Sequence, residues 1–218
     1  MTALTARGRP SWKRRLLSAF AAGAATGVAG YLFGRLVLPD LIGPDALDGV
    51  DLRWSDAMAA MTAAGLIIGA VAVLILSLDA RRLGRLYRLD EPAAPAETAQ
   101  ARFQAVVMGF SGVILLLPTA LALAGAGGPL AFVVVAALLA VHTALNLRAW
   151  RGVDELLRRT TMEAATATFF LGQGLLFLMA AGERLGVLPP ITGWDVYAVL
   201  MTLYLAASAV AAARRGLA

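Results

Sequence analysis

Three polar side chains lie inside long apolar stretches of this sequence, and their types and spacing suit them best for chemistry. His142 and Asn146 are four residues apart, so they share one face of a helix. Gln173 follows in a later apolar stretch, between two glycines. Imidazole titrates near neutral pH and can accept a proton or contact a ligand. The pattern favours an interhelical hydrogen bond that links His142 or Asn146 to Gln173, and the alternative is a small polar site between two helices.

No catalytic or metal-binding motif accompanies these residues. The chain has no cysteine and one histidine, which excludes disulfides, thiolate metal sites and multi-histidine metal sites within one chain. It contains no Walker loop, no H-E-x-x-H and no G-x-S-x-G. The aspartates between residues 40 and 51 do not have EF-hand spacing. We predict no metal, no cofactor and no catalytic residue, so an enzyme is the less favoured class.

Glycines at four-residue spacing form a second candidate feature. Glycine at this spacing lets two helix backbones approach closely inside a membrane. The pattern predicts either packing within the protein or an interface with a membrane-protein partner or a second copy. The candidate positions are Gly23, Gly27, Gly30, Gly34, Gly65 and Gly69.

Six apolar stretches position these residues. The chain is 60% hydrophobic and 15% charged, against about 25% charged residues in soluble domains. A membrane-spanning helix needs roughly 20 apolar residues, and the stretches lack the alternation of transmembrane strands. The predicted fold class is therefore all-α, an integral membrane six-helix transmembrane bundle. Its spans are residues 16–38, 57–78, 103–124, 129–147, 164–182 and 196–213.

The basic residues orient this bundle. Of the 19 lysines and arginines, 16 fall before span one, between spans two and three, between spans four and five, or after span six. The other three are Arg35, Arg53 and Arg184. The positive-inside rule then predicts that both termini lie in the cytoplasm. The same rule explains the net charge of +5, so the lipid bilayer is the expected partner and nucleic acid is not.

One membrane domain accounts for the chain. Residues 1–12 are predicted to be a loose cytoplasmic tail, and residues 13–218 a single six-span domain. The first apolar stretch exceeds the 7–15 residues of a signal-peptide core, which favours a retained helix. Residues 90–98 are expected to form a flexible break. Residues 148–163 are expected to be helical, with Asp154/Arg158 and Glu155/Arg159 as ion pairs.

Acidic residues are absent from the middle of every predicted span. Asp79, Glu163, Glu183 and Asp195 lie at span ends, where we expect water to reach them. This argues against a proton-driven pump of the usual kind. Spans two and six are each introduced by tryptophan and aspartate, at residues 54–56 and 194–195. That similarity indicates either a duplicated hairpin or the interfacial tryptophan expected of any span.

Residues 153–164 read VDELLRRTTMEA, and Pro189, Pro190 and Trp194 precede the last span. This pattern resembles small multi-pass inner-membrane proteins of alphaproteobacteria, over about the last 70 residues. The resemblance implies the compartment and the helical bundle, and it brings no activity with it.

Three functions remain open at this level. The missing catalytic motifs and the glycine-lined first span favour a non-catalytic accessory or scaffold subunit of a membrane complex. The alternative is a small-molecule or ion transporter or channel, with its polar site between helices four and five. A lipid-modifying membrane enzyme fits least, because the spans carry no paired carboxylates or metal ligands.

Overall fold

The computed structural model describes residues 53–87 and 91–215, and every regular element within these ranges is a helix. Five of these helices are long and apolar enough to cross a membrane: α3 (Trp54–Leu76), α5 (Pro95–Leu123), α6 (Pro129–Arg151), α7 (Glu155–Arg184) and α8 (Gly193–Arg215). They match the second to sixth predicted spans, so the prediction of apolar membrane-spanning helices is confirmed for this part of the chain. The predicted tail at 1–12 and the first span at 16–38 lie outside the described residues.

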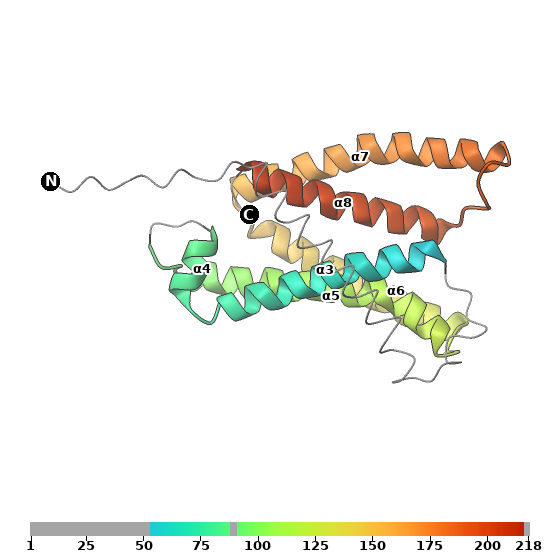
Figure 1. Cartoon of the computed structure of the whole chain (residues 1–218). Helices are drawn as coiled ribbons and strands as arrows, with labels where there is room; N and C mark the ends of the chain where they lie inside the picture. Colours follow the sequence, from blue (N-terminus) through green and yellow to red (C-terminus); the bar gives the residue numbers. More distant parts are fainter. Residues whose placement is uncertain (1–52, 88–90, 216–218) are drawn as a thin grey trace, which may run out of the picture.

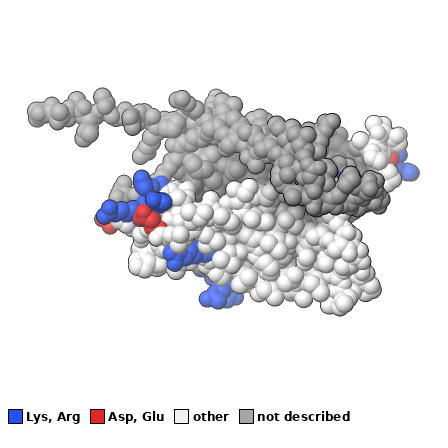
Figure 2. Space-filling model, turned by 60° about the horizontal axis from the view of Figure 1, so that its bottom comes forward, with Lys and Arg blue, Asp and Glu red and all other residues white. Residues whose placement is uncertain are grey.

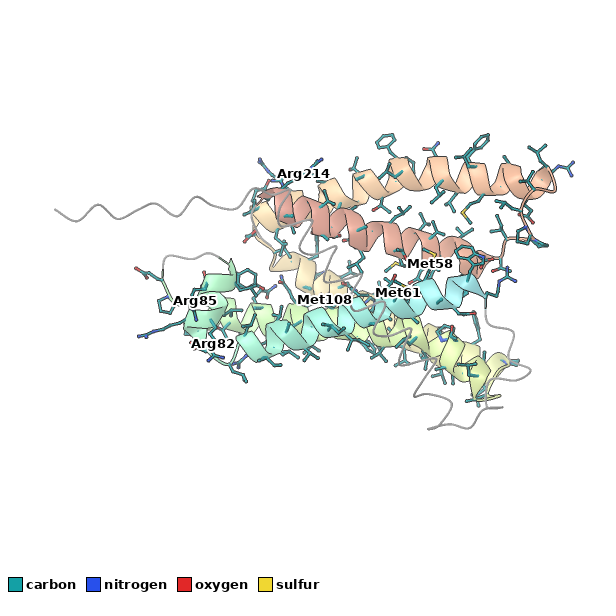
Figure 3. The ribbon with its side chains drawn as sticks, viewed as in Figure 1. Met58, Met61, Arg82, Arg85, Met108 and Arg214 are labelled. Carbon is teal, nitrogen blue, oxygen red and sulfur yellow. The ribbon has the colours of Figure 1, made fainter. Side chains whose placement is uncertain are left out.

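Helices α3, α5 and α8 form the centre of the bundle, and α6 and α7 flank it (Figure 1). Helix α3 packs on α5 and α8, α6 packs on α5, and α7 packs on α8. Successive long helices run in opposite directions, so the arginine-rich segments gather at one end of the bundle. Figure 3 shows Arg82, Arg85 and Arg214 at this end, which we call the basic end. The opposite end, where α3 begins, is called the Arg53 end.

The surface between these ends is largely uncharged. Figure 2 shows charged side chains near the two ends of the visible face and uncharged surface along its length. Large apolar side chains are exposed on the long helices, including Phe132 on α6 and Phe169 and Phe177 on α7. Exposed apolar side chains of this size on long apolar helices fit an apolar surrounding such as lipid. The distribution therefore matches that of an integral membrane protein.

A short helix at the basic end was not predicted. Helix α4 (Ala80–Tyr87) begins where the Asp79 carboxylate accepts a hydrogen bond from Arg81 N at 2.8 Å. Its Leu83 is fully buried against Ala93 and Ala101. Within the break expected at 90–98, Ala93 packs on Leu83 of α4, and α5 already begins at Pro95.

The turn between α6 and α7 also differs in one detail from the prediction. Glu155 and Arg159 form the expected ion pair, at 2.7 Å. Asp154 instead caps α7, and its carboxylate accepts a hydrogen bond from Leu157 N at 2.7 Å. An aspartate that precedes a helix satisfies one of the free N–H groups of the first turn. Local capping therefore starts α7 at Glu155, nine residues before the predicted span at 164–182.

Candidate functional site

A cavity of about 370 Å³ lies among all five long helices. Polar side chains contribute to its wall from every one of these helices, and apolar side chains fill the remainder. The polar lining residues are Thr62, Gln104, Ser111, Asn146, Thr161, Tyr204 and Ser208. A volume of this size lies at the lower end of the range of small-molecule sites.

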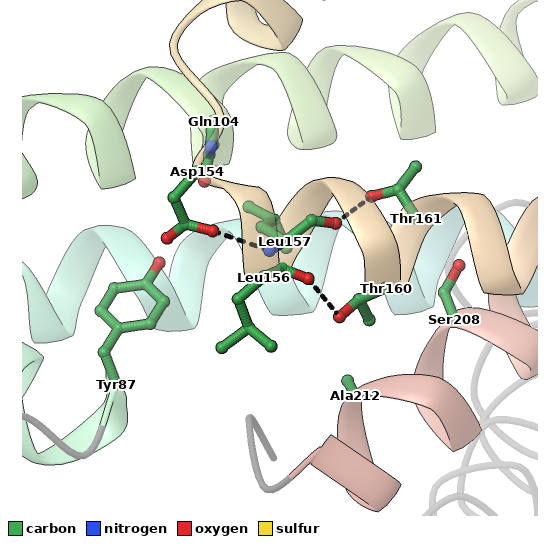
Figure 4. Close-up of a pocket in the computed structure, with 9 residues that line it drawn as sticks. All are labelled: Tyr87, Gln104, Asp154, Leu156, Leu157, Thr160, Thr161, Ser208 and Ala212. Atoms are coloured by element: carbon green, nitrogen blue, oxygen red, sulfur yellow. Dashed lines mark hydrogen bonds between the residues drawn. The ribbon is translucent and has the colours of Figure 1, made fainter.

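A second cavity of about 300 Å³ lies beside the first, on the side of the basic end (Figure 4). The two share Gln104, Leu157, Thr161 and Ser208 as wall residues. Tyr87 of α4 lies at its outer side, where partial burial raises the pKa of the phenol above its ordinary value near 10. The two cavities are therefore neighbours that share part of their wall, one toward the basic end and the other among the long helices.

Part of the polar wall is already hydrogen-bonded. Thr160 and Thr161 donate to the carbonyls of Leu156 and Leu157, at 2.8 and 2.9 Å (Figure 4). At the deep end, the hydroxyls of Thr62 on α3 and Thr202 on α8 lie 2.9 Å apart. These bonds give the threonine hydroxyls hydrogen-bond partners, within α7 for Thr160 and Thr161 and between α3 and α8 for Thr62.

Three other polar side chains of the wall keep their hydrogen-bonding capacity. Gln104, Tyr204 and Ser208 form no side-chain hydrogen bond within residues 53–87 and 91–215. Gln104 comes from α5, and Tyr204 and Ser208 come from α8. Polar groups inside membrane spans are expensive to leave without a partner. The space that they line is therefore suited to water or to a polar group of a ligand. Sequence analysis missed these residues, although Gln104 lies within the third predicted span.

His142 and Asn146 lie together on α6, as the helical spacing predicted. The His142 Nε2 atom is 2.6 Å from Ser111 Oγ on α5, and Asn146 Nδ2 is 3.2 Å from His142 Nδ1. Asn146 Nδ2 also lies 2.9 Å from His142 Nε2, and Ser111 Oγ lies 2.9 Å from Val107 O, so the three side chains form one hydrogen-bonded group. Ser111 and Asn146 line the larger cavity, and His142 does not.

Gln173 is not brought to this group. Its side chain is exposed on α7, and α7 packs on α8 rather than on α6. Among the described residues, no hydrogen bond joins Gln173 to His142 or Asn146. The neighbouring Gly172 faces α8 instead, where an added Cβ would lie 2.8 Å from Leu200 Cδ2.

The two described candidate glycines face other helices of the bundle. A Cβ on Gly65 would lie 3.4 Å from Leu205 Cδ2 of α8, and one on Gly69 would lie 3.3 Å from Met108 Cε of α5. A closer approach of two long helices is made at Gly112 on α5, which sequence analysis missed. A Cβ there would lie 2.8 Å from Ala63 O on α3. The available signal was the stripe of small residues at 101, 105, 109 and 112. Gly23, Gly27, Gly30 and Gly34 lie outside the described residues.

A polar cluster closes the Arg53 end. Asp195 pairs with Arg53, with 2.8 Å between Oδ2 and Nη2, and its side chain is 0% exposed. The same oxygen accepts from Thr192 N at 2.7 Å and from Thr192 Oγ1 at 2.9 Å. The expectation that water reaches Asp195 is therefore wrong, because the carboxylate caps α8 while it is covered by α3.

Asp56 ties three helices together beside this ion pair. Its Oδ1 atom accepts from Thr119 Oγ1 on α5 at 2.7 Å and from Trp194 Nε1 on α8 at 2.9 Å. Its Oδ2 atom accepts from Arg53 N at 2.9 Å, at the start of α3. The hydrogen bond between Asp56 and Trp194 thus links the starts of predicted spans two and six.

Comparison of the chain with models of protein families, with curated proteins and with solved structures finds no match. The geometry described above is therefore the basis for any functional conclusion.

Proposed function

We propose that this protein is a multi-pass protein of the bacterial inner membrane that binds a small molecule in the cavity and passes it across the bilayer, as a transporter or channel. The observation that carries the proposal is the pair of adjacent cavities between the basic end and the middle of the bundle, which share four wall residues. Its polar wall lies on membrane-spanning helices, where polar side chains mark substrate pathways.

The proposed orientation places the basic end, and both termini, in the cytoplasm. The positive-inside rule supports this, because arginines are concentrated at the ends of the helices that meet there. Of the described arginines, only Arg53 and Arg184 lie at the opposite end. Those at the basic end are Arg81, Arg82, Arg85, Arg102, Arg148, Arg151, Arg158, Arg159, Arg214 and Arg215.

The different arrangement of the two ends favours a transport cycle over a simple pore. The smaller cavity is lined at the basic end by Tyr87 and Asp154. At the Arg53 end, the bonds of Asp56 and Asp195 hold α3, α5 and α8 together. We propose that this arrangement is the inward-open state, and that the outward-open state requires the cluster at the Arg53 end to separate.

Cysteine accessibility tests this proposal directly, because the chain contains no cysteine of its own. The variant Ser208→Cys places a thiol on the wall shared by both cavities. A charged, membrane-impermeant methanethiosulfonate reagent is applied to inside-out and to right-side-out vesicles. We expect labelling in inside-out vesicles. Phe177→Cys, on the exposed apolar face of α7, serves as the lipid-facing control and is expected to stay unlabelled. Labelling of Ser208→Cys no faster than that of Phe177→Cys would refute a water-accessible pathway.

A second candidate is the accessory or scaffold subunit of a membrane complex. It is favoured by α6, which among the described helices packs chiefly on α5 and whose apolar middle is not buried. Purification from the native host in mild detergent, followed by mass determination of the intact particle, distinguishes the candidates. A stoichiometric partner protein would support the subunit function. A particle that contains only this chain would support the transporter or channel.

A further inference from the structure

The larger cavity has a composition that indicates which ligands it accepts. We infer that it binds an uncharged amphipathic molecule, with a hydroxyl, amide or carbonyl group attached to an apolar body. This inference rests on the proposed function, and it adds the chemical class of the ligand.

The absence of charge in the wall excludes bare ions. Among the described residues that line the larger cavity, none is Asp, Glu, Lys, Arg or His. The smaller cavity contains one charged residue, Asp154, whose carboxylate is engaged by Leu157 N at the start of α7. Moving an ion from water into low-dielectric surroundings without a counter-charge is strongly unfavourable. A charged ligand would therefore enter the larger cavity without compensation from its described wall residues.

The uncommitted polar groups determine what the ligand must carry. Gln104 offers an amide that both donates and accepts, and Tyr204 and Ser208 offer hydroxyls that do the same. A neutral hydroxyl, amide or carbonyl group can pair with any of them. Gln104 and Ser208 line both cavities. Both side chains therefore lie at the wall that the two cavities share.

The rest of the wall requires an apolar body. Met108, Met201, Leu66, Leu205 and Trp150 line the same space. About a dozen water molecules would fill 370 Å³, and many of them would contact these side chains without a hydrogen-bond partner. Methionine side chains are flexible and adapt to apolar ligands of different shape. An amphipathic molecule satisfies both kinds of wall at once.

Three probes that share one alkyl chain and differ in their head group test the inference. They are decanol, decanoate and decyltrimethylammonium, each radiolabelled. Binding is measured by equilibrium dialysis of the full chain in phosphatidylcholine nanodiscs, with empty nanodiscs subtracted. We expect saturable binding of decanol, and affinities at least tenfold lower for decanoate and decyltrimethylammonium.

A matched pair of substitutions locates the bound probe. Gln104→Leu removes an amide from the cavity wall, while Gln173→Leu makes the same change on the exposed face of α7. The loss of one hydrogen bond is expected to weaken decanol binding roughly two- to tenfold in Gln104→Leu and to leave Gln173→Leu unchanged. Ser208→Ala, a smaller change in the same wall, provides the test if Gln104→Leu does not fold.

Several results would overturn the inference. These are no saturable binding of decanol, equal affinity for decanol and a charged probe, or equal effects of the wall substitutions and Gln173→Leu. The labelling of Ser208→Cys separates this inference from the proposed function. Labelling from the basic end without decanol binding would refute the ligand class and retain the pathway. A thiol that stays unlabelled would refute the pathway itself.

Discussion

Asp195 accepts several hydrogen bonds at the Arg53 end, and its replacement by asparagine tests how much these contacts stabilise the protein. The side chain is 0% exposed and accepts hydrogen bonds from Arg53 Nη2, Arg53 Nε and both donors of Thr192. Asparagine preserves the shape, and its oxygen can replace Oδ2. Its amide group then faces Arg53 Nε, so that two donors meet and the guanidinium loses its counter-charge.

The expected loss of stability follows from the burial of Asp195 and Arg53. Breaking a fully buried ion pair costs about 3–5 kcal/mol, and a hydrogen bond to a charged group contributes about 1.5–3 kcal/mol. The Arg53 side chain is 34% exposed, so water compensates for part of the lost charge. We therefore expect Asp195→Asn to lower the free energy of unfolding by about 2 kcal/mol.

Unfolding by sodium dodecyl sulfate in mixed micelles, followed by circular dichroism, measures this change. Asp79→Asn is the matched control, because Asp79 pairs with Arg82 at the surface, at 3.4 Å and with both side chains well exposed. An exposed pair contributes less than about 1 kcal/mol, and asparagine caps a helix as well as aspartate does. Equal losses of stability in the two variants would refute the assignment of a buried ion pair.

Three further substitutions test packing and polar contacts by the same unfolding measurement. Gly112→Ala should destabilise the protein by about 1–3 kcal/mol, because the new methyl group meets a backbone carbonyl of α3. Gly174→Ala, with nothing within 4 Å, should be neutral or stabilising. A greater loss of stability in Gly174→Ala than in Gly112→Ala would contradict the α3–α5 packing. Thr62→Val should cost about 0.6 kcal/mol through the lost bond to Thr202, and a loss above 2 kcal/mol would indicate a larger network. Glu163→Gln, in an exposed ion pair with α8, should cost less than about 1 kcal/mol and only at low salt.

Helices and their alternating directions could be predicted from the sequence because both depend on local properties. A stretch of about 20 apolar residues must form a helix in lipid, where each backbone group needs a partner within the segment. The arginine-rich loops then required successive helices to run in opposite directions. The contact between His142 and Asn146 follows from helical spacing alone.

Which helices pack against each other, and through which faces, depended on the tertiary structure. Gln173 was expected beside α6, but α7 packs on α8 and leaves the side chain exposed. All the described spans are apolar on most of their circumference, so hydrophobic periodicity does not say which faces meet. Small residues such as Gly112 decide this through close packing, which only the assembled helices reveal.

The burial of Asp195 and the position of the cavity also depended on the tertiary structure. An aspartate at a helix start is ordinarily reached by water, and only the approach of α3 covers this one and supplies Arg53. Gln104, Tyr204 and Ser208 are unremarkable polar residues within their spans, and they become a site because α5 and α8 face a common space. The sequence by itself thus determined the helices and the charged ends. The tertiary structure decided which polar groups meet, because those contacts join residues that are distant along the chain.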